Sequence, residues 1–548
     1  MRALTDHKSL GITYGITAGV FMLVGFLLML LFRWQLAWPG QPIPIATAIF
    51  GETNAPGGIL LPEFYYQLVA MHGSVMIFLA VVPLLTGALG SYLVPLQIGA
   101  AGLAFPRLSR LGYLLFLAAG LLMSASFALP GGAPNSGWTS YPPLAILASS
   151  GQTVWLVGVL TLGASAMLGA VSLVATVVAY RAPGLTLMRL PFFVWSQAVT
   201  AVLLLLSFPP LQAAAIFQLM DRAAGTSFFL PSGLAVSNVP LEVSGGGNPL
   251  LWQHLFWFLA HPEVYVLVLP AMGIVAEVLT AHARRNLWRY GLMVGAVVGL
   301  GAWSMVVWAH HMYLTGMGTT LSSFFQITTM TVSVPSVILI TCLIVTLWGG
   351  AIRFTTAMLF ALAFLPMFGI GGVTGLPLGL APTNLVLHDT YYVIGHFHYL
   401  VAPGTMFALF AAVYHWFPKM TGRRLHEGLG VVHFIGSFVT MNAVFLPMFF
   451  MGLMGVNRRL YDGGLQYELA APTLAWNATM TWSAVALGLF QLVFVWNLVR
   501  SARHGAPAEN PWRATTLEWA TASPPPAGNF VETPVVTGHP YRYEEGEA

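Results

Sequence analysis

Apolar stretches long enough to cross a lipid bilayer recur along almost the whole of this chain. A transmembrane helix needs about 20 mostly apolar residues. Stretches of that kind lie at 11–32, 66–95, 111–129, 152–181, 190–217, 247–281, 286–311, 328–350, 354–373, 392–417, 430–453 and 474–500. Only 7% of the residues are charged, against about 25% in soluble globular chains. The sequence therefore predicts an all-α integral membrane protein with about 12 transmembrane helices, of which the third is the shortest.

The basic residues predict the direction in which these helices run. If both termini are cytoplasmic, inner segments hold all of the 21 Lys and Arg residues except Arg33, Arg222, Arg458 and Arg459. Cytoplasmic loops are enriched in Lys and Arg, so this distribution favours cytoplasmic termini and an even number of spans. We expect a membrane domain over residues 1–500 and a mostly extended cytoplasmic tail over 501–548.

Composition excludes several other kinds of protein. The net charge of +4 arises from this inner and outer asymmetry, and no basic run with interleaved aromatic residues indicates nucleic-acid binding. Cys342 is the only cysteine, which excludes an intrachain disulfide, an iron–sulfur cluster and a two-cysteine copper centre carried by this chain alone.

Histidines within the apolar stretches indicate bound metals. They are His72, His261, His310, His311, His396 and His398. An imidazole without a partner is costly in lipid, and imidazole is the commonest protein ligand for iron, copper and zinc. His396 and His398 are two residues apart, about 200° on a helix, so they face opposite sides and predict two cofactors flanking one helix.

The sixth and seventh spans predict a further metal. His261 and Tyr265 are four residues apart and share one helix face, while Pro262 loosens the hydrogen-bond ladder between them. Together with His310 and His311 of the next span, His261 suits a copper ion that keeps one position open for a small molecule. His254, two turns before His261, is interpreted as a structural hydrogen-bonding histidine.

At these residues the chain closely resembles subunit I of the heme-copper oxidases, the cytochrome c oxidase family. Three motifs carry the resemblance: residues 260–265 (Ala-His-Pro-Glu-Val-Tyr), 308–312 (Trp-Ala-His-His-Met) and 388–399, which begin His-Asp-Thr-Tyr-Tyr. Supporting matches include Met71-His72-Gly73, residues 104–107, Gly137-Trp138-Thr139, residues 141–143 and residues 371–375. The resemblance covers essentially the whole membrane part, from Arg33 to Arg459.

The resemblance implies a role for each histidine. His72 and His398 are expected as the two axial ligands of a low-spin heme, and His396 as the single axial ligand of a high-spin heme. His261, His310 and His311 are expected to hold the copper facing that second iron. Tyr265 is expected to be joined covalently to His261 and to donate an electron and a proton as the O–O bond breaks.

Residues near the heme edges follow from the same resemblance. Arg458 and Arg459 are expected to neutralise heme propionates, and Arg33 and Trp138 to lie beside the hemes. His388 and Asp389 are expected to contribute to a magnesium or manganese site at a subunit interface, where a carboxylate suits a hard ion. The resemblance does not distinguish a-type from b-type hemes.

Proton supply is where the chain departs from the family. Gly102 stands where the family has an aspartate that takes up protons, Ser91 and Ser109 replace asparagines on the same route, and Leu339 replaces a membrane lysine. Glu263, the inner end of the first route, is retained, and such an intramembrane acid is functional by default.

Glu277 suggests a replacement for the missing proton route. It lies 14 residues after Glu263, about 21 Å further along the same helix, and is a possible proton uptake point feeding Tyr265 or Glu263. The alternative is an interfacial glutamate that reaches water or pairs with Arg284 or Arg285.

The resemblance thus predicts the catalytic subunit of a respiratory terminal oxidase in a bacterial plasma (inner) membrane, one that reduces O2 to water. It leaves open whether the reaction is coupled to proton translocation. Nitric oxide reduction is the alternative reaction, against which Tyr265 argues and which the missing proton routes favour. A third alternative is a heme-bearing assembly or sensor protein. The ligand set argues against it, because such a protein would not need a complete set of ligands with an open coordination position.

Partner subunits are expected as well. Subunit II would carry a dinuclear copper centre and pass electrons from cytochrome c, and subunit III or a similar chain would accompany it. A quinol-fed oxidase is the alternative, although Phe64 occupies the position of the quinol-site histidine and only Gln67 matches that site.

Overall fold

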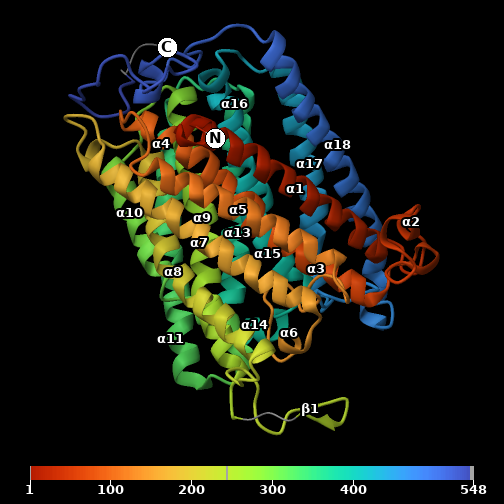
Figure 1. Cartoon of the computed structure of the whole chain (residues 1–548). Coiled ribbons are helices and arrows are strands. Elements are labelled where there is room, and N and C mark those ends of the chain that lie inside the picture. The colour runs from red at the N-terminus through yellow and green to blue at the C-terminus, as the bar shows by residue number, and fades with distance from the viewer. Residues whose placement is uncertain (1, 242–244, 544–548) are drawn as a thin grey trace.

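The chain folds into a bundle of long helices, described here from a computed structural model for residues 2–241 and 245–543 (Figure 1). Twelve segments of this part are long and apolar enough to cross a membrane. They are His7–Ala37, Pro62–Gln97, Pro106–Ala128, Ser150–Ala179, Phe192–Ala223, Pro249–Ala283, Tyr290–Thr315, Gly318–Thr346, Thr356–Gly379, Tyr391–Thr421, Glu427–Leu453 and Glu468–His504. The predicted number of spans is confirmed, and the third is indeed the shortest, with 23 residues.

Several spans consist of more than one helical segment. The α-helices are α1 (His7–Ala37), α2 (Ala46–Phe50), α3 (Pro62–Ser74), α4 (Ser91–Gln97), α5 (Pro106–Ala125), α6 (Leu144–Leu147), α7 (Ser150–Ala179), α8 (Phe192–Ala223), α9 (Pro249–Ala283), α10 (Tyr290–Ser304), α11 (Gly318–Thr331), α12 (Ser333–Thr346), α13 (Thr356–Gly379), α14 (Ala381–Leu387), α15 (Tyr391–Leu400), α16 (Phe407–Thr421), α17 (Glu427–Leu453) and α18 (Leu474–His504). Segments of π-helix are η3 (Val75–Val81), η4 (Pro83–Gly90) and η8 (Val401–Met406). Turns of 3₁₀-helix are η1 (Arg2–Thr5), η2 (Pro56–Gly58), η5 (Ser126–Ala128), η6 (Leu187–Arg189), η7 (Trp308–Thr315), η9 (Glu468–Thr473) and η10 (Leu517–Ala520).

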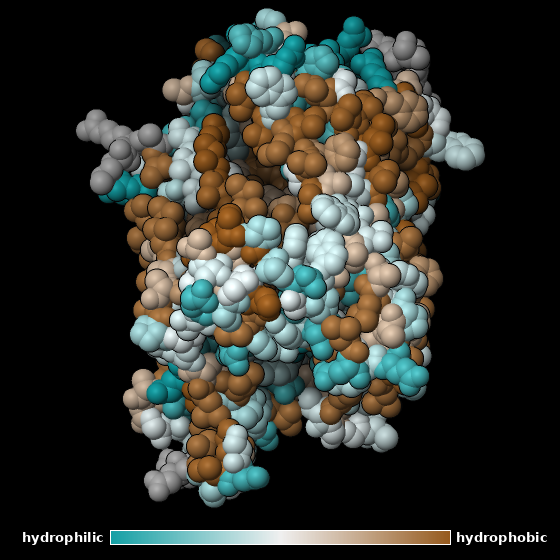
Figure 2. All heavy atoms as spheres, turned by 90° about the vertical axis from the view of Figure 1, so that its right-hand side faces the viewer, coloured by the Kyte–Doolittle hydropathy of each residue, from teal (hydrophilic) through white to brown (hydrophobic). Residues whose placement is uncertain are grey.

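The surface of the bundle is that of a protein surrounded by lipid. Large apolar side chains are exposed along the outer helices, for example Ile16 on α1, Ile327 on α11 and Leu492 on α18. Figure 2 shows hydrophobic residues over much of one flank, with hydrophilic residues gathered at the end that carries the termini. Both termini lie at the same end of the bundle (Figure 1), as an even number of spans requires. We call this the terminal end.

Helix α9 forms the centre of the bundle. Of its most apolar window, 89% is buried, against 17% for the first and the last spans. The helix begins where the Asn248 side chain accepts a hydrogen bond from Leu250 N and Pro249 occupies the first turn, a favourable start for a helix. It packs against α8, α16, α13 and η7. A short antiparallel pair, β1 (Ala235–Val236) and β2 (Val239–Pro240), lies outside the bundle in the α8–α9 connection.

Helix α15, which carries His396 and His398, is fixed by α17. An added Cβ at Gly452 of α17 would lie 2.0 Å from Tyr392 N, so the two backbones meet closely at this point. The segment after α17 also returns to the start of α15: Arg458 N donates to Asp389 O at 2.7 Å, and Arg458 Nε and Nη2 lie 2.7 and 2.6 Å from Asp389 Oδ1.

The tail after α18 covers the terminal end (Figure 1). Helix α18 continues to His504, four residues past the predicted domain boundary, and the described residues 505–543 have little regular structure. Glu518 is fully buried, and its Oε1 accepts from Gln97 Nε2 at 3.0 Å and from Trp416 Nε1 at 3.2 Å. Lys419 donates to Thr521 O at 2.7 Å. The tail is therefore packed onto the membrane domain.

Replacing Gly452 by alanine is expected to destabilise the bundle by about 1–3 kcal/mol, the usual cost of overpacking. The new methyl group would force α15 and α17 apart and disturb His396 and His398. Thermal unfolding of the purified protein measures the change. Gly299→Ala in α10 is the matched control, because no atom lies within 4 Å of its added Cβ, and a stabilising change of up to about 1 kcal/mol is expected there. Equal melting temperatures for the two variants would contradict the close approach.

Asp389→Asn is expected to lower stability at pH 7 but not at low pH. Burial raises the pKa of Asp389, but Arg458, Arg459 and His388 outweigh it and hold the pKa below its usual value. Stability from such a carboxylate is present above the unfolded pKa of about 3.9 and is lost as the pH falls through the folded pKa. The side chain is 43% exposed, so the difference from wild type at pH 7 is about 1 kcal/mol or less. Unfolding curves between pH 3 and 7 should converge in acid, and a constant offset would contradict the ion pair.

Candidate metal centre

Three histidines from two segments bring their ring nitrogens together beside α9. His261 Nδ1 lies 3.3 Å from His311 Nε2, and His310 Nε2 lies 3.1 Å from the same atom. One nitrogen of each ring falls within 4.8 Å of the others. Three neutral imidazoles at this spacing are a donor set that suits copper or zinc. Among the described residues, this is the one group of three or more His, Cys, Asp or Glu side chains whose ligand atoms lie this close together.

Neighbouring helices hold the rings of this cluster in place. His310 Nδ1 lies 2.9 Å from Thr329 Oγ1 on α11. The His311 ring stacks on Trp257, with centroids 3.7 Å apart and planes inclined by 7°. Trp257 Nε1 in turn donates to Tyr141 Oη at 2.5 Å. Burial raises the pKa of Tyr141 to about 12 although the Trp257 hydrogen bond lowers it, so the phenol stays neutral.

The His261 and Tyr265 rings lie side by side on α9, as their spacing predicts. Their centroids are 5.1 Å apart. His261 is buried, and its Nδ1 faces the histidine cluster while its Nε2 has no hydrogen-bond partner. A buried polar atom without a partner is rare in native structures. It fits the expected covalent link, which would use that free nitrogen.

The remaining three histidines share one mode of anchoring. His72 Nδ1 lies 2.8 Å from Gly25 O, His396 Nδ1 lies 2.9 Å from Gly371 O, and His398 Nδ1 lies 2.8 Å from Ile394 O. A carbonyl accepts only from N–H, so each ring carries its proton on Nδ1 and keeps Nε2 for a metal. Metal-ligating histidines are oriented in this way.

His396 and His398 face opposite sides of α15, as predicted. His396 contacts α13, where its Nδ1 also lies 3.4 Å from Thr374 Oγ1, and His398 stacks on Phe445 of α17 with centroids 4.5 Å apart. An added Cβ at Gly375 would lie 2.8 Å from His396 Cε1. Helix α13 leaves space for the His396 ring only because residue 375 is glycine. Since His396 and His398 point to opposite sides, the residues present fit one planar cofactor on each side of α15.

The predicted basic residues occupy two places near this centre. Arg33 is 3% exposed and donates to Asn477 O at 2.8 Å and to Thr481 Oγ1 at 3.2 Å. Arg458 pairs with Asp389, and His388 Nε2 lies 3.7 Å from the other oxygen, Oδ2. His388 and Asp389 are therefore close enough to share an ion.

His254, predicted to be structural, and Trp138, expected beside the hemes, also have clear partners. His254 accepts from Trp308 Nε1 at 3.3 Å, which confirms it as a hydrogen-bonding histidine. Trp138 packs edge-on against Phe78, Phe256 and Trp257. It therefore lies against the helix that carries His261.

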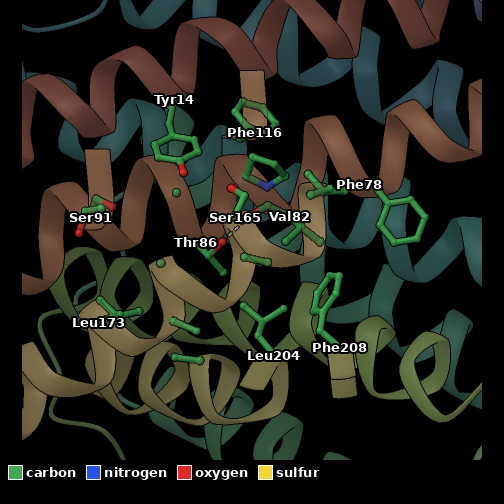
Figure 3. Close-up of a pocket in the computed structure, with 18 of the residues that line it drawn as sticks. Tyr14, Phe78, Val82, Thr86, Ser91, Phe116, Ser165, Leu173, Leu204 and Phe208 are labelled. Carbon is green, nitrogen blue, oxygen red and sulfur yellow. Dashed lines mark hydrogen bonds between the residues drawn. The ribbon is translucent and has the colours of Figure 1, made fainter. Parts of the chain in front are cut away.

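Glu263 lies at a cavity that extends toward the terminal end. The carboxyl group is 3% exposed and its Oε2 has no hydrogen-bond partner. The cavity offers about 70 Å³ to the centres of water molecules, enough for several waters at about 10–15 Å³ each. Its polar lining comes from Tyr14, Thr86, Ser91, Ser109 and Ser165, and Figure 3 shows the Tyr14 hydroxyl pointing toward its middle. Ser91 and Ser109 are the two serines expected, from the resemblance, to stand in place of asparagines on this route.

Glu277 lies beneath the tail and does not reach solvent. It is 3% exposed, and its Oε1 accepts from Tyr541 Oη at 2.7 Å and from Phe193 N, at the start of α8, at 3.1 Å. Burial and the adjacent Glu277 carboxyl raise the pKa of Tyr541 well above its usual value. The phenol therefore remains a donor, and this carboxyl group contacts the tail of its own chain.

The groups that orient the histidines have almost no signature in the sequence. Trp257, Tyr141 and Thr329 come from three different segments, and the backbone carbonyls of Gly25 and Gly371 have no side-chain signature at all. Two signals were available: Tyr141 lies in the matched motif at 141–143, and Gly371 lies in the matched motif at 371–375.

Comparison with known proteins agrees with this geometry. Residues 9–490 match the family model of cytochrome c and quinol oxidase polypeptide I. The chain is 42% identical over 542 residues to a cytochrome c oxidase subunit 1 of Synechocystis, covering 98% of this chain and 91% of the relative. It is 41% identical over 548 residues to an alternative cytochrome c oxidase subunit 1 of Bradyrhizobium diazoefficiens, covering 98% and 90%.

A solved structure shares the fold. The chain superposes on a heme-copper terminal oxidase dimer with a TM-score of 0.71 at 19% identity, covering 92% of this chain and 86% of that one. With twelve apolar helices and bacterial relatives, it is a multi-pass protein of the bacterial plasma membrane. The chain belongs to the family of cytochrome c and quinol oxidase polypeptide I, the heme- and copper-containing subunits of heme-copper terminal oxidases.

Proposed function

We propose that this chain is the catalytic subunit of a respiratory oxidase that reduces O2 to water with electrons from cytochrome c. The observation that carries the proposal is the complete set of six histidines, each with one ring nitrogen left for a metal. Three converge within 4.8 Å, and three are anchored through Nδ1 to backbone carbonyls. A ligand set of this completeness supports catalysis over a role in assembly or sensing.

We assign the two hemes and the copper by residue. His72 and His398 are the axial pair of the low-spin heme, and His396 is the single ligand of the high-spin heme. The copper belongs to His261, His310 and His311. When bound, these groups supply the electrons and the open coordination positions that O2 reduction needs. The protein's own contribution is to orient the rings and exclude water.

Tyr265 supports oxygen over nitric oxide as the substrate. Its phenol lies beside His261 on the same helix face, where it is close enough to the copper ligands to pass a proton and an electron to the reacting oxygen. Nitric oxide reduction requires no such phenol. We therefore assign Tyr265 as the catalytic tyrosine and nitric oxide reduction as the second candidate.

The surroundings of Gln67 favour cytochrome c over quinol as the electron source. Its Nε2 donates to Gly131 O at 3.1 Å and its Oε1 accepts from Ala133 N at 3.1 Å. Both ends of the amide are therefore engaged by the protein, and Phe64 offers no polar group in place of the quinol-site histidine. We propose a partner subunit II with a dinuclear copper centre, and a subunit III or similar chain.

The Asp389 region supports a divalent ion at the boundary with that partner. Arg458 occupies Oδ1, while Oδ2 and His388 Nε2, 3.7 Å apart, remain for Mg²⁺ or Mn²⁺. Two ligands are too few for either ion, so water and a partner group would complete the site. Arg458 and Arg459 would neutralise the heme propionates, with Arg33 near the low-spin heme.

Two carboxyl groups are assigned to proton transfer. Glu263, with its free Oε2 at the inner end of the cavity, would pass protons to the metal centre. Glu277 lies three helical turns from Tyr265, about 18 Å along α9, and would take up protons for that tyrosine. Its burial argues against a glutamate that reaches water directly, so a proton would have to reach it by way of its hydrogen-bond partner Tyr541.

The function is tested by O2 and NO consumption of the purified complex with reduced cytochrome c. We expect rapid, cyanide-sensitive O2 uptake and little anaerobic NO turnover, because Tyr265 is in place. Fast NO consumption with negligible O2 uptake would make this chain a nitric oxide reductase. As controls for the assignment, His398→Ala should remove the low-spin heme spectrum, whereas His396→Ala should keep it and abolish ligand binding to the high-spin heme.

Glu277→Gln is expected to slow O2 turnover by at least about tenfold, the lower range for loss of a proton-transfer group. Glutamine keeps an oxygen that can accept from Tyr541 and Phe193, so a merely structural role predicts normal turnover. Steady-state O2 uptake between pH 6 and 9, with the heme spectrum as a check on folding, distinguishes the two. Unchanged turnover across this range would exclude Glu277 as a proton uptake point.

A further inference from the structure

The tail crosses the terminal end of the bundle as an extended strap, residues 536–543 (Figure 1). The strap is tied at both ends to connections between helices. Val536 N donates to Pro183 O at 2.9 Å in the α7–α8 connection. Tyr543 N donates to Asn286 Oδ1 at 3.0 Å in the α9–α10 connection. The strap therefore passes over the start of α8 and the end of α9.

Side chains of the strap alternate between the protein and the solvent. Tyr541 and Tyr543 are buried, whereas Arg542 between them is exposed. This is the alternation of an extended chain that lays one face on a surface. The Tyr541 hydroxyl donates to Glu277 Oε1 at 2.7 Å and accepts from Phe192 N at 2.8 Å. Both sides of this hydroxyl are therefore engaged while the strap is in place.

Tyr541 cannot relay a proton to Glu277 in this arrangement. A phenol that passes on its proton must receive another one at its oxygen. The group that donates to the Tyr541 oxygen is a backbone N–H, which does not release its proton. Glu277 is itself only 3% exposed. Water therefore reaches the carboxyl group when Tyr541 moves away with the strap.

A few local contacts hold the strap in place. Thr515 Oγ1 donates to Pro540 O at 2.8 Å and accepts from Arg542 N at 3.2 Å. The Arg284 guanidinium lies 5.3 Å from the centre of the Tyr543 ring. The described residues 536–543 contain no helix or strand. Segments with so few backbone hydrogen bonds open locally at a lower free energy than the whole fold.

We propose that the strap is a gate over Glu277 and that Tyr541 is its positioning residue. The strap opens to admit a proton and closes to separate the loaded carboxyl group from bulk water. This inference rests on the proposed role of Glu277 in proton uptake. The step moves one proton and no electrons: a hydronium ion gives its proton to the carboxylate and leaves as water before Tyr541 returns.

The test is a crosslink that holds the strap closed in the intact complex. Asn286 and Arg542 are both exposed, and Asn286 binds the residue next to Arg542. Cys342, the only native cysteine, is buried. Asn286→Cys combined with Arg542→Cys can therefore be joined by a short bifunctional thiol reagent after folding. The same double variant without the crosslink is the control, so a change in folding does not enter the comparison.

Two readouts follow the crosslinked protein, and neither depends on O2 chemistry. The first is proton uptake during anaerobic reduction of the bound hemes, measured with a pH-sensitive dye. The second is labelling of Glu277 by a water-soluble carbodiimide and an amine, measured by mass spectrometry. We expect crosslinking to slow uptake at least about tenfold and to suppress the labelling of Glu277. Glu509, an exposed glutamate of the tail, should be labelled equally in both forms.

The two readouts separate failure of the gate from failure of the function on which it rests. Equal labelling of Glu277 with and without the crosslink would overturn the gate. Labelling that falls while uptake keeps its rate would also overturn the proposal, and it would trace the failure to the proposed role of Glu277 and not to the strap.

Tyr541→Phe separates positioning from packing, because it keeps the ring and removes the donor to Glu277. The readout is the infrared C=O band of the Glu277 carboxyl group, assigned as the band that Glu277→Gln removes. A carbonyl oxygen that loses a hydrogen bond vibrates at higher frequency. We expect the band to move in that direction and Glu277 to be labelled faster, with an unchanged heme spectrum. An unmoved band would show that Tyr541 only packs against the bundle.

Discussion

An imidazole inside a membrane-length helix must find a partner for each of its nitrogens, because lipid offers none. In this chain one nitrogen is repeatedly given to the protein and the other is left for a metal. Gly25, Gly371 and Ile394 supply backbone carbonyls for His72, His396 and His398. The Ile394 carbonyl belongs to α15 itself, but Gly25 and Gly371 lie on α1 and α13, so the anchoring of His72 and His396 depends on the packing of the bundle. The orientation of these metal ligands therefore depends on how the helices pack.

Close backbone contact makes this arrangement possible. Gly452 lets α17 meet α15, and Gly375 leaves room beside His396. The ion pair between Asp389 and Arg458 then ties the end of α17 to the start of α15. Arg222, one of the four arginines predicted to lie on the outer side, also binds backbone carbonyls: it donates to those of Ala145 and Ser149, among others.

The terminal end of the bundle carries a second set of buried polar groups, and the tail supplies partners for most of them. Tyr541 donates to Glu277, Glu518 accepts from Gln97, and Asn529 joins His7 to Ala100. The sequence composition predicted only an extended tail. In the structure this tail contacts and covers the buried titratable groups Glu277 and His7 at this end of the bundle.

The sequence alone determined the number of spans, the six histidines, and the placement of His396 and His398 on opposite faces of one helix, because hydrophobic length and helical periodicity are local properties. It also identified Glu263 and Glu277 as unusual acids, since a charge inside a span is visible without a fold. Only the tertiary structure decided which nitrogen of each ring is free, that Glu277 meets Tyr541, and that His7 adjoins Gly102. The contacts of His396, His72, His7 and Glu277 join residues 25, 47, 95 and 264 positions apart, and no local pattern encodes a contact between distant segments. The physical reason is that side-chain orientation in a packed bundle is decided by partners from other helices.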